Sequence, residues 1–349
     1  MLNMNIPPQL SVAIMAAGMI AVVASPLCAQ AVERHYYGAK FEPREGVLHG
    51  AGQTYYREPA DGPLSQGFNN YAQVVGPQRF PLLYMDYTNW RATTESFYAS
   101  LGQRLDAIEA KDDRRVVPQL GMVLPAGEQR LTEQHLDNLA AGLRSLDRPV
   151  FFRPGYEANG PWNRLSAATF IANYRMIADR VREENLPVAM VWNVVVGDGG
   201  PWSTWAKAKR FYPGDTYVDW WSFNLFGTAT FDEPVWRAEV DKFLAAAHAA
   251  EKPVMIGEAT PQFVGAEDAS DWETWFAKFF ARIDDSPGIK AHSYINRDWG
   301  ATHPHDGWTP WQDSRLETAA PRVRANYLKE ISNSLYIHAG PTLREFFGE

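Results

Sequence analysis

Residues 149–162 read Pro-Val-Phe-Phe-Arg-Pro-Gly-Tyr-Glu-Ala-Asn-Gly-Pro-Trp. The first four are mostly apolar, and Arg153 with the Pro-Gly pair after it ends this run, so we expect a short buried strand. Glu157 follows at once, with the aromatic residues Tyr156 and Trp162 close by in the sequence. Among aromatic side chains a carboxyl group is partly withdrawn from water, which raises its pKa and suits a general acid. The alternative for this stretch alone is an exposed loop glutamate.

In a second stretch, residues 252–258, a short apolar run is again followed by one carboxylate. It reads Lys-Pro-Val-Met-Ile-Gly-Glu, and the last residue is Glu258. Two carboxylates at the carboxyl ends of two parallel strands can face one cleft, and glycoside hydrolysis requires such a pair. The alternative for Glu258 is a structural ion pair with an arginine at the rim of the fold.

Short apolar runs alternate with helical patterns along the whole chain. Ser166 and Asp271 are the expected N-caps of two of the helices. The alternation predicts an α/β protein with a single (β/α)8 TIM barrel. An open doubly wound sheet is the alternative, but no glycine-rich phosphate loop follows the first strand. The expected strands are residues 46–50, 81–87, 116–120, 149–152, 188–192, 217–223, 253–257 and 289–295, and the expected helices are residues 64–75, 93–110, 132–146, 166–181, 202–210, 234–250, 271–283 and 317–333.

The amino-acid composition and net charge of the chain limit the classes of molecule that it can be expected to bind. The chain has 349 residues, of which 46% are hydrophobic and 21% charged, and its formal net charge is −8. Because it has no long basic run, we expect no nucleic-acid partner. The 13 Trp, 15 Tyr and 18 Phe residues either fill a large core or provide stacking platforms for sugar rings.

The first 31 residues predict a secretory signal peptide. Residues 10–24 form an apolar core too short to span a membrane comfortably, and small residues follow up to Ala31. The first nine residues contain no Lys or Arg, so an uncleaved anchor is the alternative. Cleavage would leave residues 32–349 as a periplasmic or secreted catalytic domain without a membrane span. It would also remove Cys28, the only cysteine, so the mature protein would have no disulfide.

Short motifs follow one another in order along residues 32–349. They are Gly46-Val47-Leu48-His49-Gly50, Arg153-Pro154 with Glu157 and Asn159-Gly160-Pro161-Trp162, Tyr212-Pro213-Gly214-Asp215 with Tyr217-Val218-Asp219-Trp220, Lys252-Pro253-Val254 with Glu258, and Asn296-Arg297-Asp298-Trp299. In order and spacing they resemble glycoside hydrolase family 26, a family best known for β-mannanases. This family belongs to a clan of barrels with catalytic glutamates on strands four and seven.

The resemblance implies a retaining mechanism in which Glu157 is the acid/base and Glu258 the nucleophile. It implies that Arg153 lies beneath the site and keeps a carboxylate ionised. Trp299 would stack under the sugar at the cleavage point, and Trp162 and Trp192 would line neighbouring subsites. The other residues that we place on the substrate side are His49, Tyr156, Asn224 and Phe226.

Two departures from the family pattern bear on the substrate. The family commonly has His before the acid/base, where this chain has Tyr156. At the end of strand six it commonly has Asp, one residue and Tyr, where this chain has Asn224-Leu225-Phe226. That Tyr usually donates a hydrogen bond to the nucleophile, which Phe226 cannot do. Because both glutamates are present, the predicted hydrolysis is unchanged. The lost polar groups leave the identity of the substrate open, mannan included.

The expected function is hydrolysis of a β-linked polysaccharide or oligosaccharide by a monomeric enzyme without a cofactor. The candidate polymers are β-mannan, mixed-linkage β-glucan, xylan and, as an alternative, a bacterial exopolysaccharide. Residues 303–306, His-Pro-His-Asp, have neither a cysteine nor helical spacing, so we expect a polar loop and no metal site. No Gly-x-Ser-x-Gly motif supports a serine hydrolase. A glycan-binding barrel that has lost turnover is the alternative from another class, and the retained pair of glutamates argues against it.

Overall fold

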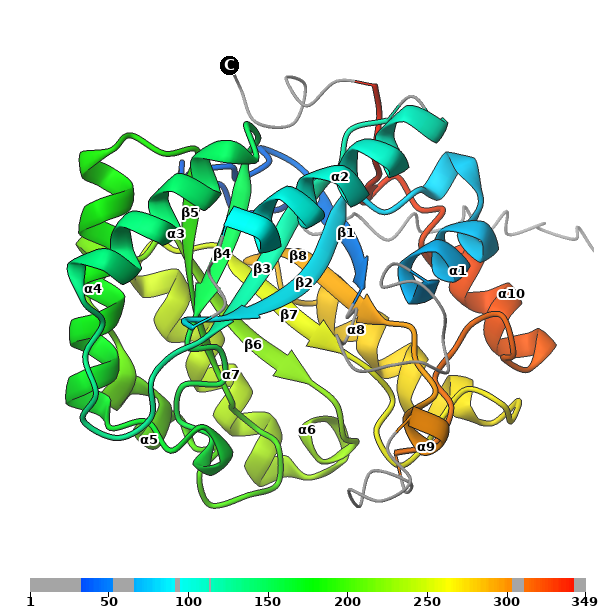
Figure 1. Ribbon diagram of the computed structural model, residues 1–349. Coiled ribbons are helices and arrows are strands. Elements are labelled where there is room, and N and C mark those ends of the chain that lie inside the picture. The colour runs from blue at the N-terminus through cyan, green and yellow to red at the C-terminus, as the bar shows by residue number, and fades with distance from the viewer. Residues whose placement is uncertain (1–32, 53–65, 92–94, 113, 303–310, 342–349) are drawn as a thin grey trace, which may run out of the picture. The chain divides into compact units, whose positions relative to one another are not determined.

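The computed structural model describes residues 33–52, 66–91, 95–112, 114–302 and 311–341. The predicted signal peptide, Cys28 and the 303–306 loop lie outside these residues. Eight parallel strands close into a barrel, because the first strand pairs with both the second and the eighth (Figure 1). The predicted (β/α)8 barrel is therefore confirmed. The strands are β1 (Val47–Gly52), β2 (Leu83–Asn89), β3 (Val117–Val123), β4 (Val150–Pro154), β5 (Val188–Val194), β6 (Trp220–Leu225), β7 (Val254–Ala259) and β8 (Ile289–Ile295).

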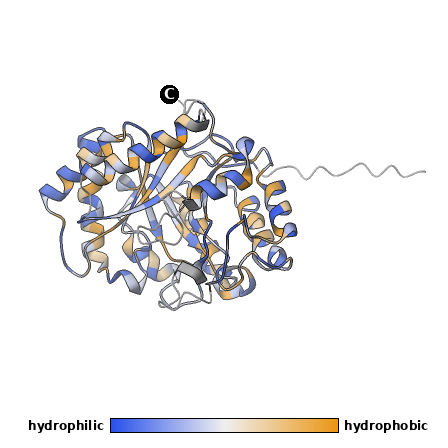
Figure 2. Cartoon of the chain, turned by 45° about the vertical axis from the view of Figure 1, so that its right-hand side comes forward, coloured by the Kyte–Doolittle hydropathy of each residue, from blue (hydrophilic) through white to orange (hydrophobic). Residues whose placement is uncertain are grey.

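Helices lie around the strands (Figure 1). They carry both hydrophobic and hydrophilic residues, as expected for helices that bury one side and expose the other (Figure 2). They are α1 (Gln66–Val75), α2 (Glu95–Asp112), α3 (Glu133–Ser145), α4 (Ala167–Glu183), α5 (Trp205–Ala208), α6 (Ala229–Asp232), α7 (Pro234–Ala249), α8 (Ala277–Asp284), α9 (Trp299–Thr302) and α10 (Pro321–Glu330). A two-residue strand, β9 (Tyr336–Ile337), pairs with β1. None of the helices in the described ranges is both long and apolar enough to cross a membrane.

Several predicted boundaries differ from the observed ones for local reasons. Ser166 caps α4 as predicted, since its side chain accepts a hydrogen bond from the backbone N–H of Thr169. Asp271 does not cap the next predicted helix: its own backbone is helical, and its carboxylate accepts instead from the N–H of Asp268. β6 begins at Trp220 rather than at residue 217, because a 3-10 turn occupies residues 215–217.

The two sides of each strand face different surroundings. Along β5 the indole of Trp192 points outward into the helical layer, so Asn193 points into the barrel. The barrel interior contains polar side chains that bond one another. For example, Ser293 donates to the side-chain oxygen of Gln119, whose amide nitrogen donates to the Gly257 carbonyl at 2.7 Å. The inner face of the barrel thus carries polar side chains, whereas the outward side of β5 packs on the helices.

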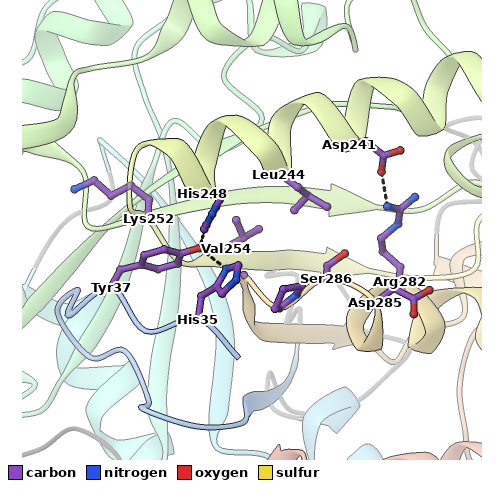
Figure 3. Close-up of a pocket in the computed structure, with 12 residues that line it drawn as sticks. His35, Tyr37, Asp241, Leu244, His248, Lys252, Val254, Arg282, Asp285 and Ser286 are labelled. Atoms are coloured by element: carbon purple, nitrogen blue, oxygen red, sulfur yellow. Dashed lines mark hydrogen bonds and ion pairs between the residues drawn. The ribbon is translucent and has the colours of Figure 1, made fainter. Parts of the chain in front are cut away.

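A hollow of about 260 Å³ opens at the amino-terminal end of the barrel (Figure 3). In it the hydroxyl of Tyr37 lies 2.9 Å from Nδ1 of both His35 and His248. Val254, the first residue of β7, lines the same hollow. Because catalytic groups of such barrels lie at the opposite, carboxyl-terminal end, these contacts join the amino-terminal segment to α7 and do not form part of the site described next.

Candidate active site

Glu258 and Arg153 form a buried ion pair at the carboxyl-terminal end of the barrel. Glu258 lies in β7 and is 4% exposed, and Arg153 lies in β4 and is fully buried. Arg153 Nη1 donates to Glu258 Oε1 at 2.9 Å. The ion pair fixes a carboxylate oxygen of Glu258 at this end of the barrel, and a carboxylate so placed can act as a nucleophile.

Two tyrosines complete the surroundings of Arg153. Its guanidinium lies 5.6 Å from the ring centre of Tyr87 and 5.8 Å from that of Tyr156. The two rings meet edge to face, with centres 5.0 Å apart. Arg153 Nη2 also donates to the Tyr87 hydroxyl at 3.3 Å. These contacts fix the plane of the guanidinium. Burial and the nearby negative charge of Glu258 raise the pKa of Tyr87, so its hydroxyl stays neutral.

A β-bulge at Gly257 sets the direction of Glu258. In the β6–β7 ladder Ile256 faces Phe223, but Glu258 faces the very next residue, Asn224, so Gly257 is extra on its strand. A Cβ atom at residue 257 would lie 2.8 Å from Arg153 Nη1. Only glycine leaves room for the guanidinium here.

Glu157 is held by a closed ring of hydrogen bonds that joins three strand ends. Its backbone N–H donates to Asn193 Oδ1 at 2.8 Å, and Asn193 Nδ2 donates to Asn224 Oδ1 at 3.0 Å. Asn224 Nδ2 then donates to Glu157 Oε1 at 2.9 Å. The backbone of Glu157 is in the left-handed region, with φ of 52°. This conformation is unfavourable for a residue other than glycine, and the ring of hydrogen bonds stabilises it.

The surroundings of Glu157 favour its protonated form. Withdrawal from water, together with the negative charge of Glu258, raises the pKa of Glu157 to about 8. Hydrogen bonds from Asn224 and from Trp162 Nε1, which lies 2.7 Å from Glu157 Oε2, oppose this rise. At neutral pH the site therefore places a protonated Glu157 beside the ion pair of Glu258 and Arg153. Such an arrangement suits general acid catalysis beside a nucleophile.

Two of the predicted substrate-binding residues lie away from the cleft. Trp192 is fully buried against Trp221 and Phe243, behind the wall of the barrel, so it lines no subsite. His49 is also fully buried, where it bonds His338 and Tyr71. Both predictions were wrong for one reason: successive strand residues point to opposite faces, and these two side chains point outward.

The remaining predicted residues lie at or beyond the carboxyl-terminal ends of their strands, in different environments. Trp162 is 48% exposed, so nearly half of its surface remains in contact with solvent. Trp299 is only 4% exposed and packs on Trp311, with ring centres 5.0 Å apart. Phe226 is partly buried in the same apolar cluster, 5.4 Å from Trp311 between ring centres. Asn224, predicted to bind substrate, bonds Glu157 instead.

Sequence reasoning missed Asn193, Tyr87 and Gly257. Asn193 directly follows the predicted fifth strand, but that strand is apolar throughout, so its pattern does not show that Asn193 points into the barrel. The roles of Tyr87 and Gly257 in the site depend on contacts between strands, and a local sequence pattern does not show such contacts. In the described part of the chain no three His, Cys, Asp or Glu side chains are grouped so as to hold a metal ion.

Comparison with known proteins agrees with this geometry. The sequence matches the family described as Glycosyl hydrolase family 26 over residues 111–296, more than half of the chain. A β-1,3-xylanase from Alcaligenes sp is 26% identical over 92% of this chain and 71% of the relative. β-1,3-xylanase TXYA from Vibrio sp is 25% identical over 92% of this chain and 72% of the relative.

A solved structure shares the fold. The double mutant of the Cellulomonas fimi endo-β-1,4-mannanase aligns with a TM-score of 0.60 and 15% identity, over 91% of this chain and 80% of that one. The resemblance of the short motifs is confirmed by the family match, which includes the segments that carry Arg153, Glu157 and Glu258. This chain belongs to glycosyl hydrolase family 26 and is a glycoside hydrolase.

Proposed function

We propose that the protein is a secreted or periplasmic enzyme that hydrolyses internal linkages of a β-linked polysaccharide with retention of configuration. Glu157 is its acid/base and Glu258 its nucleophile. The observation that carries the proposal is the contrast between the two carboxyl groups. Glu258 is paired with the buried cation of Arg153, whereas the pKa of Glu157 is raised to about 8. Residues 1–31 would be removed on export, and the enzyme would act as a monomer.

The reaction proceeds in two displacements. In the first, an oxygen of Glu258 attacks the anomeric carbon, the bond from that carbon to the glycosidic oxygen breaks, and Glu157 donates its proton to the departing oxygen. This leaves a glycosyl ester on Glu258. In the second, ionised Glu157 takes a proton from water while the water oxygen attacks the anomeric carbon. The ester bond breaks, and the Glu258 carboxylate and the protonated Glu157 are restored.

Among the candidate polymers we favour β-1,3-xylan. Two proteins named β-1,3-xylanases align with 92% of this chain, whereas the mannanase structure supports a common fold alone. The replacement of two polar positions by Tyr156 and Phe226 also fits a substrate other than mannan. A pentose polymer has no hydroxymethyl group, so it needs fewer polar contacts around the cleavage point.

Product release from a polymer panel tests the proposal. The panel contains β-1,3-xylan, β-1,4-xylan, β-mannan, mixed-linkage β-glucan and bacterial exopolysaccharides, each incubated with the unmodified protein, Glu157→Ala and Glu258→Ala. We expect β-1,3-xylan to yield short oligosaccharides, with loss of at least about 1,000-fold in Glu258→Ala. Proton NMR should show the β-anomer as the first product. Appearance of the α-anomer first would contradict retention, and intact polymer bound without cleavage would favour a binding protein.

A further inference from the structure

The loop after β5, residues 195–203, is fixed against the loop that carries Glu157. Asn159 makes the connection: its Oδ1 accepts from the Val195 N–H, and its Nδ2 donates to the carbonyls of Val195 and Trp202, each at 2.8 Å. The rings of Trp202 and Trp162 then meet edge to face, with centres 6.0 Å apart. The two loops therefore form one rigid wall beside the acid/base.

Two glycines in the left-handed region present Asp198 from this wall. Gly197 has φ of 72° and Gly199 has φ of 81°. A Cβ atom at residue 197 would lie 2.5 Å from a methyl carbon of Val240 and 2.9 Å from the carbonyl oxygen of Trp236, so the backbone there packs tightly on α7. The position of Asp198 is thus set by a specific turn rather than by a loose surface loop.

The described residues provide no counter-charge for the Asp198 carboxylate. Within the described residues it has neither a hydrogen-bond nor an ion-pair partner, and it is only partly exposed. Withdrawal from water raises the pKa of Asp198 to about 6, and its charge in turn contributes to the raised pKa of Glu157. A desolvated carboxylate without a partner is costly, so an arrangement that keeps one beside the acid/base points to a ligand that completes it.

The hydrogen-bond partners of the two carboxylate oxygens of Glu157 show on which side of Glu157 the loop of Asp198 lies. Oε1 bonds Asn224, the neighbour of Glu258 in the β6–β7 ladder. Oε2 bonds Trp162, which contacts Trp202 in the loop of Asp198. Because Glu157 protonates the departing oxygen, the side away from Glu258 receives the leaving group.

We propose that Asp198 binds the leaving-group sugar, its carboxylate accepting hydrogen bonds from two neighbouring hydroxyl groups of a ring that stacks on Trp162. This inference rests on the proposed function and adds to it a residue that recognises the sugar released in the first displacement. An ionised carboxylate has two acceptor oxygens and no donor, so it matches a pair of hydroxyl donors. The exposed indole of Trp162 supplies the apolar face that a sugar ring needs.

The test compares two substrates with the same glycone. One is an unmodified oligosaccharide of the polymer that the protein cleaves, and the other carries an aryl leaving group, which has no hydroxyl groups for Asp198. In Asp198→Ala we expect kcat/KM to fall about 10- to 100-fold on the oligosaccharide and less than about threefold on the aryl glycoside. Asp179→Asn, a change to an exposed surface carboxylate of α4 that pairs with Arg182, is the matched control and should leave both values unchanged.

A second variant separates recognition from a structural effect. Asp198→Asn keeps the size of the side chain but removes its charge, so the pKa of Glu157 should fall. The alkaline limb of the pH profile should then move to lower pH on both substrates. Equal losses of activity on both substrates in Asp198→Ala, or no loss on either, would overturn the role of Asp198 but not the proposed function. Inactivity of the unmodified protein on every substrate would instead overturn the proposed function, and this inference with it.

Discussion

Replacing Asn224 with alanine isolates the hydrogen bond that most directly opposes protonation of Glu157. Asn224 Nδ2 lies 2.9 Å from Glu157 Oε1 and lowers the pKa of Glu157 against the effects of burial and of Glu258. A hydrogen bond to a charged group contributes about 1.5–3 kcal/mol, and one pKa unit corresponds to about 1.4 kcal/mol. Since Glu157 is partly exposed, we take the lower end of this range and expect its pKa to rise by about one unit.

The assay is the pH dependence of kcat/KM, whose alkaline limb reports the acid of the free enzyme. In the unmodified protein this limb should lie near pH 8, the pKa of Glu157, and in Asn224→Ala it should lie about one unit higher. The turnover number should also fall about tenfold, because ionised Glu157 is the base of the second displacement in the proposed mechanism. Asn138→Ala, on the exposed side of α3, is the control. An unchanged limb, or one displaced to lower pH, would show that the hydrogen bond from Asn224 does not lower the pKa of Glu157.

Three further predictions concern the packing of the site and of the barrel. Gly257→Ala should lower the free energy of unfolding by about 1–3 kcal/mol in urea titration, because the added methyl group would lie 2.8 Å from Arg153 Nη1. A stability equal to that of the unmodified protein would contradict the role of the bulge. Arg153→Met should cost about 3–5 kcal/mol in urea titration, since it leaves the charge of Glu258 buried and unpaired. A cost below about 1 kcal/mol would argue against this role of the ion pair. Burial lowers the pKa of His292 to about 3, so the unfolded chain binds its proton first, and stability is lost as the pH falls from about 6.5 toward 3. His292→Leu should lose less stability over that range in thermal melts followed at several pH values, whereas parallel curves for the two proteins would exclude this histidine as a cause.

The strand pattern made the architecture predictable. Eight short apolar runs of strand length, separated by helical patterns, leave few folds other than the barrel, and each glutamate follows its run directly. Such a pattern fixes which residues lie at a strand end. It therefore predicted that Glu157 and Glu258 belong to the same end of the barrel, as the structure shows.

The direction of each side chain was harder to predict. A strand buried on both faces is apolar throughout, so its pattern does not tell which residues point inward. For this reason Trp192 was assigned to the cleft in place of Asn193. The bulge at Gly257 changes the register by one residue, and a single glycine after an apolar run is only a weak signal for it.

The electrostatic contrast between the two glutamates also lay beyond the sequence. It depends on Arg153 reaching Glu258 across the barrel and on Asn224 reaching Glu157 from another strand. These pairs are separated by 105 and 67 residues. Local pattern can place each partner on a strand, but only the closed barrel brings them within hydrogen-bond distance.

Trapping the covalent intermediate tests whether Glu258 is the nucleophile. An activated 2-fluoro glycoside of the sugar that the protein cleaves slows the second displacement, so the glycosyl ester accumulates and can be located by peptide mass spectrometry. We expect the added sugar mass on the peptide that contains Glu258, and none in Glu258→Gln. A sugar attached to any other carboxylate, or turnover without a covalent adduct and with inversion at the anomeric carbon, would contradict the account.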